Sequence, residues 1–358
     1  MALELTGRER VWLALHHREA DRVGVMDAIW STTLERWQRE GMPEGAPPET
    51  LFDYDMRQIR PDFSLQLPTV TVEETEEYAI VRDGYGKTVR NWKHRMSTPD
   101  WIDFLIKTPA DWEAHKYRAA WNSSRVDWEA ARRTYAEGRA EGKFMYYAGA
   151  ISWDATLPLI GPEAMLYALA DNHAWVRDMY QAQADLYLAG AEELMGAGFE
   201  FDGAWVYDDM AYRSGPFFSP RTYDELFFPH DKRVCDFFNA RGIPVILHTD
   251  GQIGPLIPRL IEAGYACLQP LEVKAGMDVV ALKKQYGDVL AFMGGIDTRA
   301  MSDPDPRAIE REIATKIPVA MQGGGYIYHS DHSVPDLVSL EQYRRVLDLV
   351  RHYGRFAG

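Results

Sequence analysis

The sequence predicts an α/β protein whose core is a single (β/α)8 barrel, with helical and β-hairpin elaborations near the N-terminus. From about Phe144 onward, short apolar strands alternate strictly with helices, which is typical of a parallel sheet. The 358 residues also exceed the roughly 250 that such a barrel needs. We expect residues 1–358 to form one domain. A doubly wound open sheet is the runner-up, but no Gly-rich phosphate loop follows an early strand.

The N-terminal part is less regular than the rest. Residues 7–23 predict a short amphipathic helix, and an apolar strand over residues 23–26 ends on Asp27. A longer irregular region follows, in which partial alternation over residues 69–93 favours one or two β-hairpins. Residues 108–139 are charged and mostly helical, and Asp127 is a candidate N-cap.

The second half supplies the regular units. Apolar strands are expected within the segments 144–152, 203–210, 243–251, 265–272, 289–297 and 325–332. Helices are expected over residues 161–198, 219–242, 255–263, 277–286, 306–317 and 340–353. This pattern gives at least six strand–helix units before the N-terminal part is included.

The composition excludes several function classes. Acids outnumber bases by 54 to 39, so the net charge of −15 disfavours binding to nucleic acid or to an anionic membrane. The only cysteines are Cys235 and Cys267, which rules out a disulfide framework and a thiol-rich zinc site. Residues 1–10 are polar, and no apolar run reaches the roughly 18 residues of a membrane span. We therefore expect a cytoplasmic protein.

Chemistry in a parallel barrel is found where the strands end. The polar residues at the ends of the proposed strands are mostly acids and histidines, and they should converge on one mouth. They are Asp27, Ser152, Asp154, Asp208, Asp209, His248, Asp250, Gln269, Glu272, Asp297, His329, Asp331 and His332.

The sharpest local motif is His248-Thr249-Asp250. Imidazole and carboxylate one residue apart at a strand end suit zinc or a similar divalent ion. The alternative is that His248 is a hydrogen-bonded barrel residue and Asp250 a helix cap, and the spacing alone favours this alternative. Asp208 could bind a substrate hydroxyl, act as a base or ligate metal, but a solvated acid or a cap is an even alternative.

Several long segments of the second half resemble the uroporphyrinogen decarboxylase superfamily. They are DDM at 208–210, SPRTYDELFFPHDKR at 219–233, GIPVILHTDGQIGPLIPRLIEAGYACLQPLE at 242–272, AGMDVVALKKQYGDVLAFMGGID at 275–297 and GGGYIYHSDHSVPDLVSLEQYRRVLDLVRHYG at 323–354. This resemblance implies a (β/α)8 barrel. It also implies one of two chemistries, which are cofactor-independent decarboxylation and metal-dependent methyl transfer linked to a corrinoid protein.

The N-terminal segment argues against the decarboxylase of that superfamily. The decarboxylases carry an Arg-rich segment that grips the porphyrinogen carboxylates, whereas VGVMDAIWSTTLERW at 23–37 offers Asp27 and no arginine before Arg36. The zinc methyltransferases use a His-x-Cys pair and a later Cys, and here His248, Asp250 and His332 stand at those positions. Such harder ligands favour an oxygen-bearing substrate, and HTDG is similar to the HSDG of relatives that demethylate methoxylated aromatics.

The resemblance therefore implies the methyltransferase component of a corrinoid-dependent demethylase. His248, Asp250 and His332 are the expected ligands of a metal, most simply zinc. Asp208 is expected as a fourth ligand or substrate contact, and Asp27 and His329 as further substrate contacts. The aromatic side chains expected to hold a substrate ring are Trp30, Trp153, Tyr207 and Tyr328.

The expected partners are a small methyl donor and a separate corrinoid protein, since the length leaves no room for a second cofactor domain after the barrel. Two alternatives remain open. One is a decarboxylase of a smaller acid, in which Asp27 or Asp208 handles protons. The other is a non-catalytic binding or scaffold member of the superfamily. A homodimer is also left open.

Overall fold

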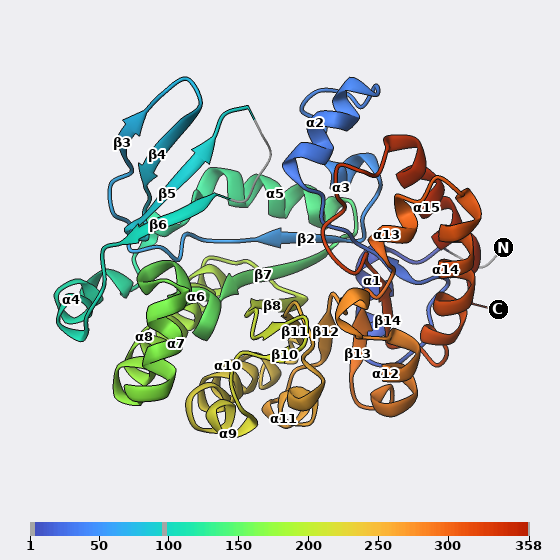
Figure 1. Cartoon of the computed structure of the whole chain (residues 1–358). Helices are drawn as coiled ribbons and strands as arrows, with labels where there is room; N and C mark the ends of the chain where they lie inside the picture. The colour runs from blue at the N-terminus through green and yellow to red at the C-terminus, as the bar shows by residue number, and fades with distance from the viewer. Residues whose placement is uncertain (1–3, 95–98, 357–358) are drawn as a thin grey trace.

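The barrel is built from eight parallel strands (Figure 1). The computed structural model describes residues 4–94 and 99–356. Within them the sheet order is β1-β14-β13-β12-β11-β8-β7-β2, which is the expected (β/α)8 class. The strands are β1 (Gly24–Val25), β2 (Met56–Ile59), β7 (Phe144–Ala150), β8 (Gly203–Tyr207), β11 (Val245–His248), β12 (Cys267–Gln269), β13 (Ala291–Met293) and β14 (Tyr326–Tyr328).

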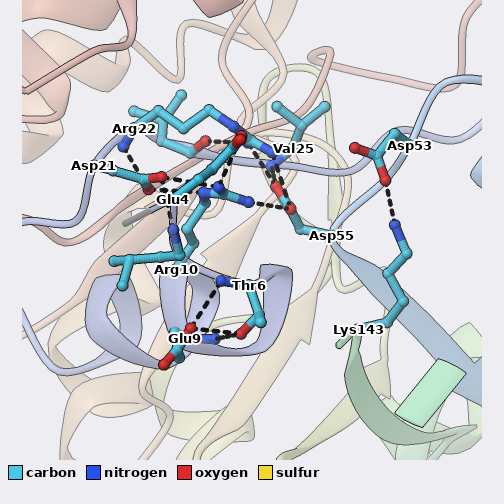
Figure 2. Close-up of polar contacts among 12 residues, drawn as sticks. Glu4, Thr6, Glu9, Arg10, Asp21, Arg22, Val25, Asp53, Asp55 and Lys143 are labelled. Atoms are coloured by element: carbon cyan, nitrogen blue, oxygen red, sulfur yellow. Dashed lines mark hydrogen bonds and ion pairs between the residues drawn. The ribbon is translucent and has the colours of Figure 1, made fainter. Parts of the chain in front are cut away.

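The two strands at the ends of this order, β1 and β2, meet at a seam that a side chain helps to close. The backbone N–H of Asp55, just before β2, donates to the carbonyl of Val25 at 2.7 Å. The N–H of Val25 donates in turn to the Asp55 carboxylate, Oδ2, also at 2.7 Å. Figure 2 shows this carboxylate between β1 and the guanidinium groups of Arg10 and Arg22. A buried ion network thus takes part in closing the barrel at this seam.

Two apolar layers surround the strands, because neighbouring residues of a strand point to opposite faces. The inner layer fills the barrel and includes Met56, Tyr146 and Trp205. The outer layer is larger and packs the strands against the helices. Both cysteines are buried, Cys267 in the inner layer and Cys235 in the outer one, as expected of inert thiols.

Helices follow most strands and cover the outside of the barrel (Figure 1). The predicted N-cap is present, because the Asp127 side chain accepts from Ala130 N. The Ser219 side chain caps another helix by accepting from Thr222 N. The larger helices are α1 (Gly7–Leu15), α2 (Ser31–Arg39), α5 (Trp128–Ala140), α6 (Ser152–Ile160), α7 (Pro162–Asp171), α8 (His173–Gly196), α10 (Phe228–Asn239), α12 (Val279–Tyr286), α14 (Pro306–Ala320) and α15 (Leu340–Tyr353). Shorter ones are α3 (Pro48–Leu51), α4 (Pro109–His115), α9 (Pro220–Thr222), α11 (Ile257–Ala263) and α13 (Thr298–Met301).

A four-stranded antiparallel sheet is inserted between β2 and α4 and stands beside the barrel (Figure 1). Its strands are β3 (Val70–Glu74), β4 (Tyr78–Arg82), β5 (Lys87–Trp92) and β6 (Asp100–Phe104). The predicted hairpins over residues 69–93 are confirmed, and β6 adds a strand that the alternation did not indicate.

Two details of the N-terminal prediction were wrong. The first helix ends at Leu15 rather than near residue 23, because the chain turns at His17, whose φ is +51°. The irregular region also contains the barrel strand β2. No helix in the described part of the chain is long and apolar enough to cross a membrane. That residues 1–358 form one domain stays a prediction.

Candidate active site

The C-terminal ends of the strands surround a cavity of about 270 Å³. Its lining contains both kinds of side chain that the sequence indicated, which are polar residues at strand ends and aromatic rings. The lining residues are Met26, Ala28, Trp30, Trp205, Tyr207, His248, Asp250, Gln269, Pro270, His329, His332 and Ser333.

One group of possible metal ligands lies at the ends of β8 and β11 and comprises Asp209, His248 and Asp250. The His248 Nε2 atom is 3.5 Å from Asp209 Oδ1, and the same oxygen accepts from the backbone N–H of Asp250 at 2.8 Å. On its other side, His248 Nδ1 contacts the side-chain oxygen Oε1 of Gln269. Gln269 therefore fixes the imidazole so that Nε2 points to the carboxylates.

A second group comprises Asp250, Glu272 and His332. The His332 Nε2 atom lies 3.6 Å from Asp250 Oδ2, and the His332 ring stacks on Trp30 with centroids 6.0 Å apart. Glu272 Oε2 accepts from the Gly251 N–H at 2.8 Å. The two groups share Asp250. The structure thus gathers the three predicted ligands around Asp250, but His248 and His332 belong to different groups.

The electrostatics of these groups fit a bound cation. The Asp250 Oδ1 atom is buried and has no hydrogen-bond partner within residues 4–94 and 99–356. Burial, followed by the charge of Asp209, raises the pKa of Asp250 to about 6. Burial lowers the pKa of His248, but Asp209 and Asp250 outweigh it, so the net shift is upward. Carboxylates crowded in this way are stabilised by positive charge, and the donor set of imidazole and carboxylate suits a divalent ion.

Asp208 is turned away from this cluster, so the geometry corrects its expected role as ligand or substrate contact. It is fully buried on the helix-facing side of β8, where its Oδ1 accepts from the Asp154 N–H at 3.0 Å. Burial and the neighbouring Asp231 raise its pKa well above the usual range. Strand alternation could have found this, because Tyr207 faces the cavity and the next residue on that side is Asp209.

Asp27 is held by hydrogen bonds at the mouth. Its Oδ2 accepts from the hydroxyls of Tyr328 and Tyr343, both at 3.1 Å, and its Oδ1 accepts from the Ser330 N–H at 3.2 Å. His329 lines the cavity, and burial lowers its pKa. Asp27 is therefore a buried anchor between β1 and β14 that lines a neighbouring cavity of about 310 Å³, whereas His329 lines the cavity that contains His248.

The four aromatic residues predicted as cavity walls divide into two pairs. Trp30 and Tyr207 line the cavity. Trp153 lies in α6 and stacks on Phe217 at 5.1 Å, and the Tyr328 ring is buried in the outer layer, so neither is a wall. Trp205 lines the cavity instead, and the sequence did not single it out because it occupies the middle of an apolar strand.

Comparisons with known proteins agree with this architecture. A family model described as uroporphyrinogen decarboxylase matches residues 156–353. Uroporphyrinogen decarboxylase from Pectobacterium atrosepticum is 26% identical over 141 residues, which are 38% of each chain. The protein of the same name from Yersinia pestis is 24% identical over 179 residues, 48% of this chain and 45% of that one. The chain thus matches less than half the length of these curated relatives.

A solved structure matches over nearly the whole length. It is a methyltransferase from Methanosarcina mazei, with a TM-score of 0.69 and 13% sequence identity, covering 98% of this chain and 99% of that one. At such low identity the match shows the fold. The family model covers more than half of the 358 residues and coincides with the barrel strands from β8 onward. The chain belongs to the uroporphyrinogen decarboxylase family.

Proposed function

We propose that the chain is the methyltransferase component of a corrinoid-dependent demethylase. It moves a methyl group from a small methoxylated aromatic compound to a Co(I) corrinoid on a separate protein. One observation carries the proposal, namely the two groups of carboxylate and imidazole atoms that share Asp250 beside an aromatic cavity. The fold, which matches that of a methanogen methyltransferase, is consistent with it.

The residues suited to hold a metal are Asp209, His248 and Asp250, with His332 and Glu272 on the other side of Asp250. We propose zinc, which takes nitrogen and oxygen ligands. When bound, the ion supplies positive charge beside the ether oxygen, where a poor phenolate leaving group needs stabilisation, and the corrinoid supplies the nucleophile.

The chain itself binds and orients the substrate. Tyr207 and Trp205 offer ring faces and edges on one side of the cavity, and Trp30 does so beside His332. Gln269 holds His248 by its Nδ1 atom, so the Nε2 edge stays directed at the carboxylates. In this proposal the methoxy oxygen of a bound ring lies at the acid–histidine cluster, as the reaction requires.

The decarboxylase alternative depends on Asp27 or Asp208 as the proton-handling group. Asp27 already accepts bonds from Tyr328, Tyr343 and Ser330, and Asp208 faces the helices. Neither carboxylate is placed as a free acid beside the acid–histidine cluster, so the geometry favours methyl transfer.

The test is a screen of methoxylated aromatics and methylamines with a reduced corrinoid protein, followed by the cobalt absorption change. We expect methyl transfer from a methoxylated aromatic by the zinc-loaded protein and its loss in His248→Ala. Asp208→Asn, which alters a carboxylate outside the cluster, is the matched control and should retain transfer. Carbon dioxide release from a carboxylated substrate without any corrinoid protein would instead establish the decarboxylase.

A further inference from the structure

The acid–histidine cluster consists of two groups of candidate ligands that share one residue. The first group is Asp209, His248 and Asp250, and the second group is Asp250, Glu272 and His332. Within each group the ligand atoms all lie within 4.8 Å of one another. In the described part of the chain, no group of this kind contains both His248 and His332. An ion bound by the first group therefore leaves the His332 imidazole without a metal.

A chain of hydrogen bonds decides which ring nitrogen of His248 is free. His329 Nδ1 donates to the carbonyl oxygen of Ser330 at 2.6 Å, so His329 Nε2 is an acceptor. The side-chain nitrogen Nε2 of Gln269 donates to that acceptor at 3.2 Å. The side-chain oxygen of Gln269 then faces His248 Nδ1, which must hold the proton of the neutral ring. His248 Nε2 therefore presents a lone pair to the carboxylates.

His332 has the same orientation. Its Nδ1 donates to the carbonyl oxygen of Ser333 at 3.4 Å, and its Nε2 lies 3.6 Å from Asp250 Oδ2. The corresponding distance from His248 Nε2 to Asp209 Oδ1 is 3.5 Å. Both distances exceed the roughly 2.7–2.9 Å of a hydrogen bond from a cationic nitrogen to a carboxylate. They are close to the roughly 3.4 Å that separates two ligand atoms of one tetrahedral zinc ion.

Such a distance does not indicate a metal by itself. His329 Nδ1 also lies 3.5 Å from a carboxylate oxygen, Oδ1 of Asp27. That nitrogen, however, carries a proton and donates it to Ser330, and neither His329 nor Asp27 belongs to the two groups. The cluster differs because each of its imidazoles directs a lone pair at a carboxylate. This arrangement is repulsive unless a cation lies between the two.

The carboxylate of Glu272 is fixed at both oxygens and can still ligate a metal. Oε2 accepts from the Gly251 N–H at 2.8 Å, and Oε1 pairs with Lys274 Nζ, also at 2.8 Å. A carboxylate oxygen has two lone pairs, so one remains on each. The Lys274 side chain is nearly half exposed, so its ammonium group can move into solvent when a second cation arrives.

We propose that Asp250 bridges two divalent ions, one in each group. The inference rests on the proposed function for the first ion, zinc, and adds a second zinc ion at Asp250, Glu272 and His332. Asp250 has an oxygen for each, because Oδ1 has no hydrogen-bond partner in the described residues and Oδ2 lies beside His332. Ions in two-metal sites are about 3.5–4 Å apart, a separation that one carboxylate can span.

The second ion adjoins the same cavity as the first. His248, Asp250 and His332 all contribute to the lining of that cavity. When bound, the second ion supplies further positive charge beside the cavity, where the proposed reaction develops a phenolate. Trp30 stacks on the outer side of the His332 ring and keeps this ligand in place.

The experiment counts bound ions and needs neither a substrate nor a corrinoid protein. The metal-free full chain is titrated with zinc in competition with a chromophoric chelator, and the metal retained after gel filtration is measured by elemental analysis. We expect the native chain to bind two ions. His332→Ala should bind one, with an affinity within about tenfold of the tighter native site, because the first group is intact.

Asp250→Asn tests the bridge itself. Its amide keeps only one oxygen as a ligand, so binding of both ions should weaken. His173→Ala is the matched control: His173 Nδ1 lies 2.9 Å from Glu225 Oε1, a direct histidine–carboxylate contact, and neither residue belongs to the two groups. This control should bind two ions like the native chain.

Two results would overturn the inference. One is a native chain that saturates at one ion, and the other is an equal number of ions in the native chain and His332→Ala. Failure of the proposed function is a separate result. A chain that binds two ions and transfers no methyl group would refute the proposed function and support the second site, whereas methyl transfer with one bound ion would do the reverse.

Discussion

The two ends of the barrel both gather charged side chains, but they use them differently. At the end where the strands begin, the Asp55 carboxylate accepts from Arg10, Arg22 and the Val25 N–H, and Arg10 also pairs with Asp21 (Figure 2). At the end where the strands finish, Asp250 keeps a buried oxygen without a partner in the described residues.

This difference separates a structural cluster from the candidate functional one. At the first end each charged group is paired with an opposite charge or a backbone donor. This network therefore stabilises the native state without any bound ligand. At the second end the carboxylates outnumber their donors, and the shortfall is relieved only when positive charge arrives. A missing donor does not mark the candidate site by itself, because the buried Oδ2 of Asp208 also lacks one. Asp250 differs in that it lines the cavity beside His248 and His332.

The largest expected effect is on stability at the first end. Asp55→Ala should lower the free energy of unfolding by about 3–5 kcal/mol, because it leaves the buried Arg10 and the Val25 N–H without this partner. Urea denaturation of the metal-free protein measures it. Asp55→Asn, which retains an acceptor for Val25, should recover part of the loss. A change below 1 kcal/mol in the Ala variant would show that the network does not hold the seam.

At the second end, the adjacent acids of β8 should differ in zinc binding. Asp209→Asn should lower the zinc affinity by more than the roughly 10–100-fold that is typical when a residue behind the ligands is changed. The reason is that Asp209 lies beside His248 Nε2 and is itself a possible ligand. Asp208→Asn should leave zinc affinity within about threefold, since that carboxylate faces the helices. Competition titration with a chromophoric chelator measures both. Equal losses in the two variants would contradict the assignment of these two side chains.

A smaller effect of opposite sign is expected for Asp250→Asn in the metal-free protein. The raised pKa of Asp250, about 6, means that the native state binds its proton more tightly than the unfolded chain does. Native stability is thus lost as pH rises from about 4 to about 6. The Asn variant avoids this loss and should be about 1–2 kcal/mol more stable than the native chain at pH 8. Urea denaturation at pH 8 and pH 4 tests this, and a variant less stable at pH 8 would refute it.

The smallest effect belongs to an exposed ion pair remote from both ends. Arg345 and Glu310 lie 3.0 Å apart with both side chains more than two-fifths exposed. Arg345→Ala should change the free energy of unfolding by less than about 0.5 kcal/mol. If Arg345→Ala lowers the free energy of unfolding as much as Asp55→Ala does, then burial does not explain the contribution of the Asp55 network.

The second half of the fold was predictable because its strands are buried on both faces. The apolar run ending at His248, for example, has the form of a strand whatever surrounds it. The strand β2 was not predictable, because it contains Arg57, whose burial depends on distant partners such as Glu141 at 2.7 Å. Only the tertiary structure makes that segment suitable for a sheet.

The site was predictable to the level of strand ends but not of individual atoms. His248 and Asp250 could be proposed as ligands because both lie at the end of one clear strand. Choosing Asp209 over Asp208 required the direction of the β8 side chains. Glu272 was among the strand-end residues, but its place beside Asp250 and His332 required the tertiary arrangement, in which its carboxylate accepts from the Gly251 N–H.

The seam also has a consequence for synthesis on the ribosome. The pairing partner of Gly24 in β1 is Ile327 in β14, which is made about 300 residues later, or about 15–60 s at ordinary elongation rates. The network of Figure 2 draws its main groups from Arg10, Asp21, Arg22 and Asp55, all of which emerge early. These contacts can therefore hold β1 in position before β14 has been synthesised.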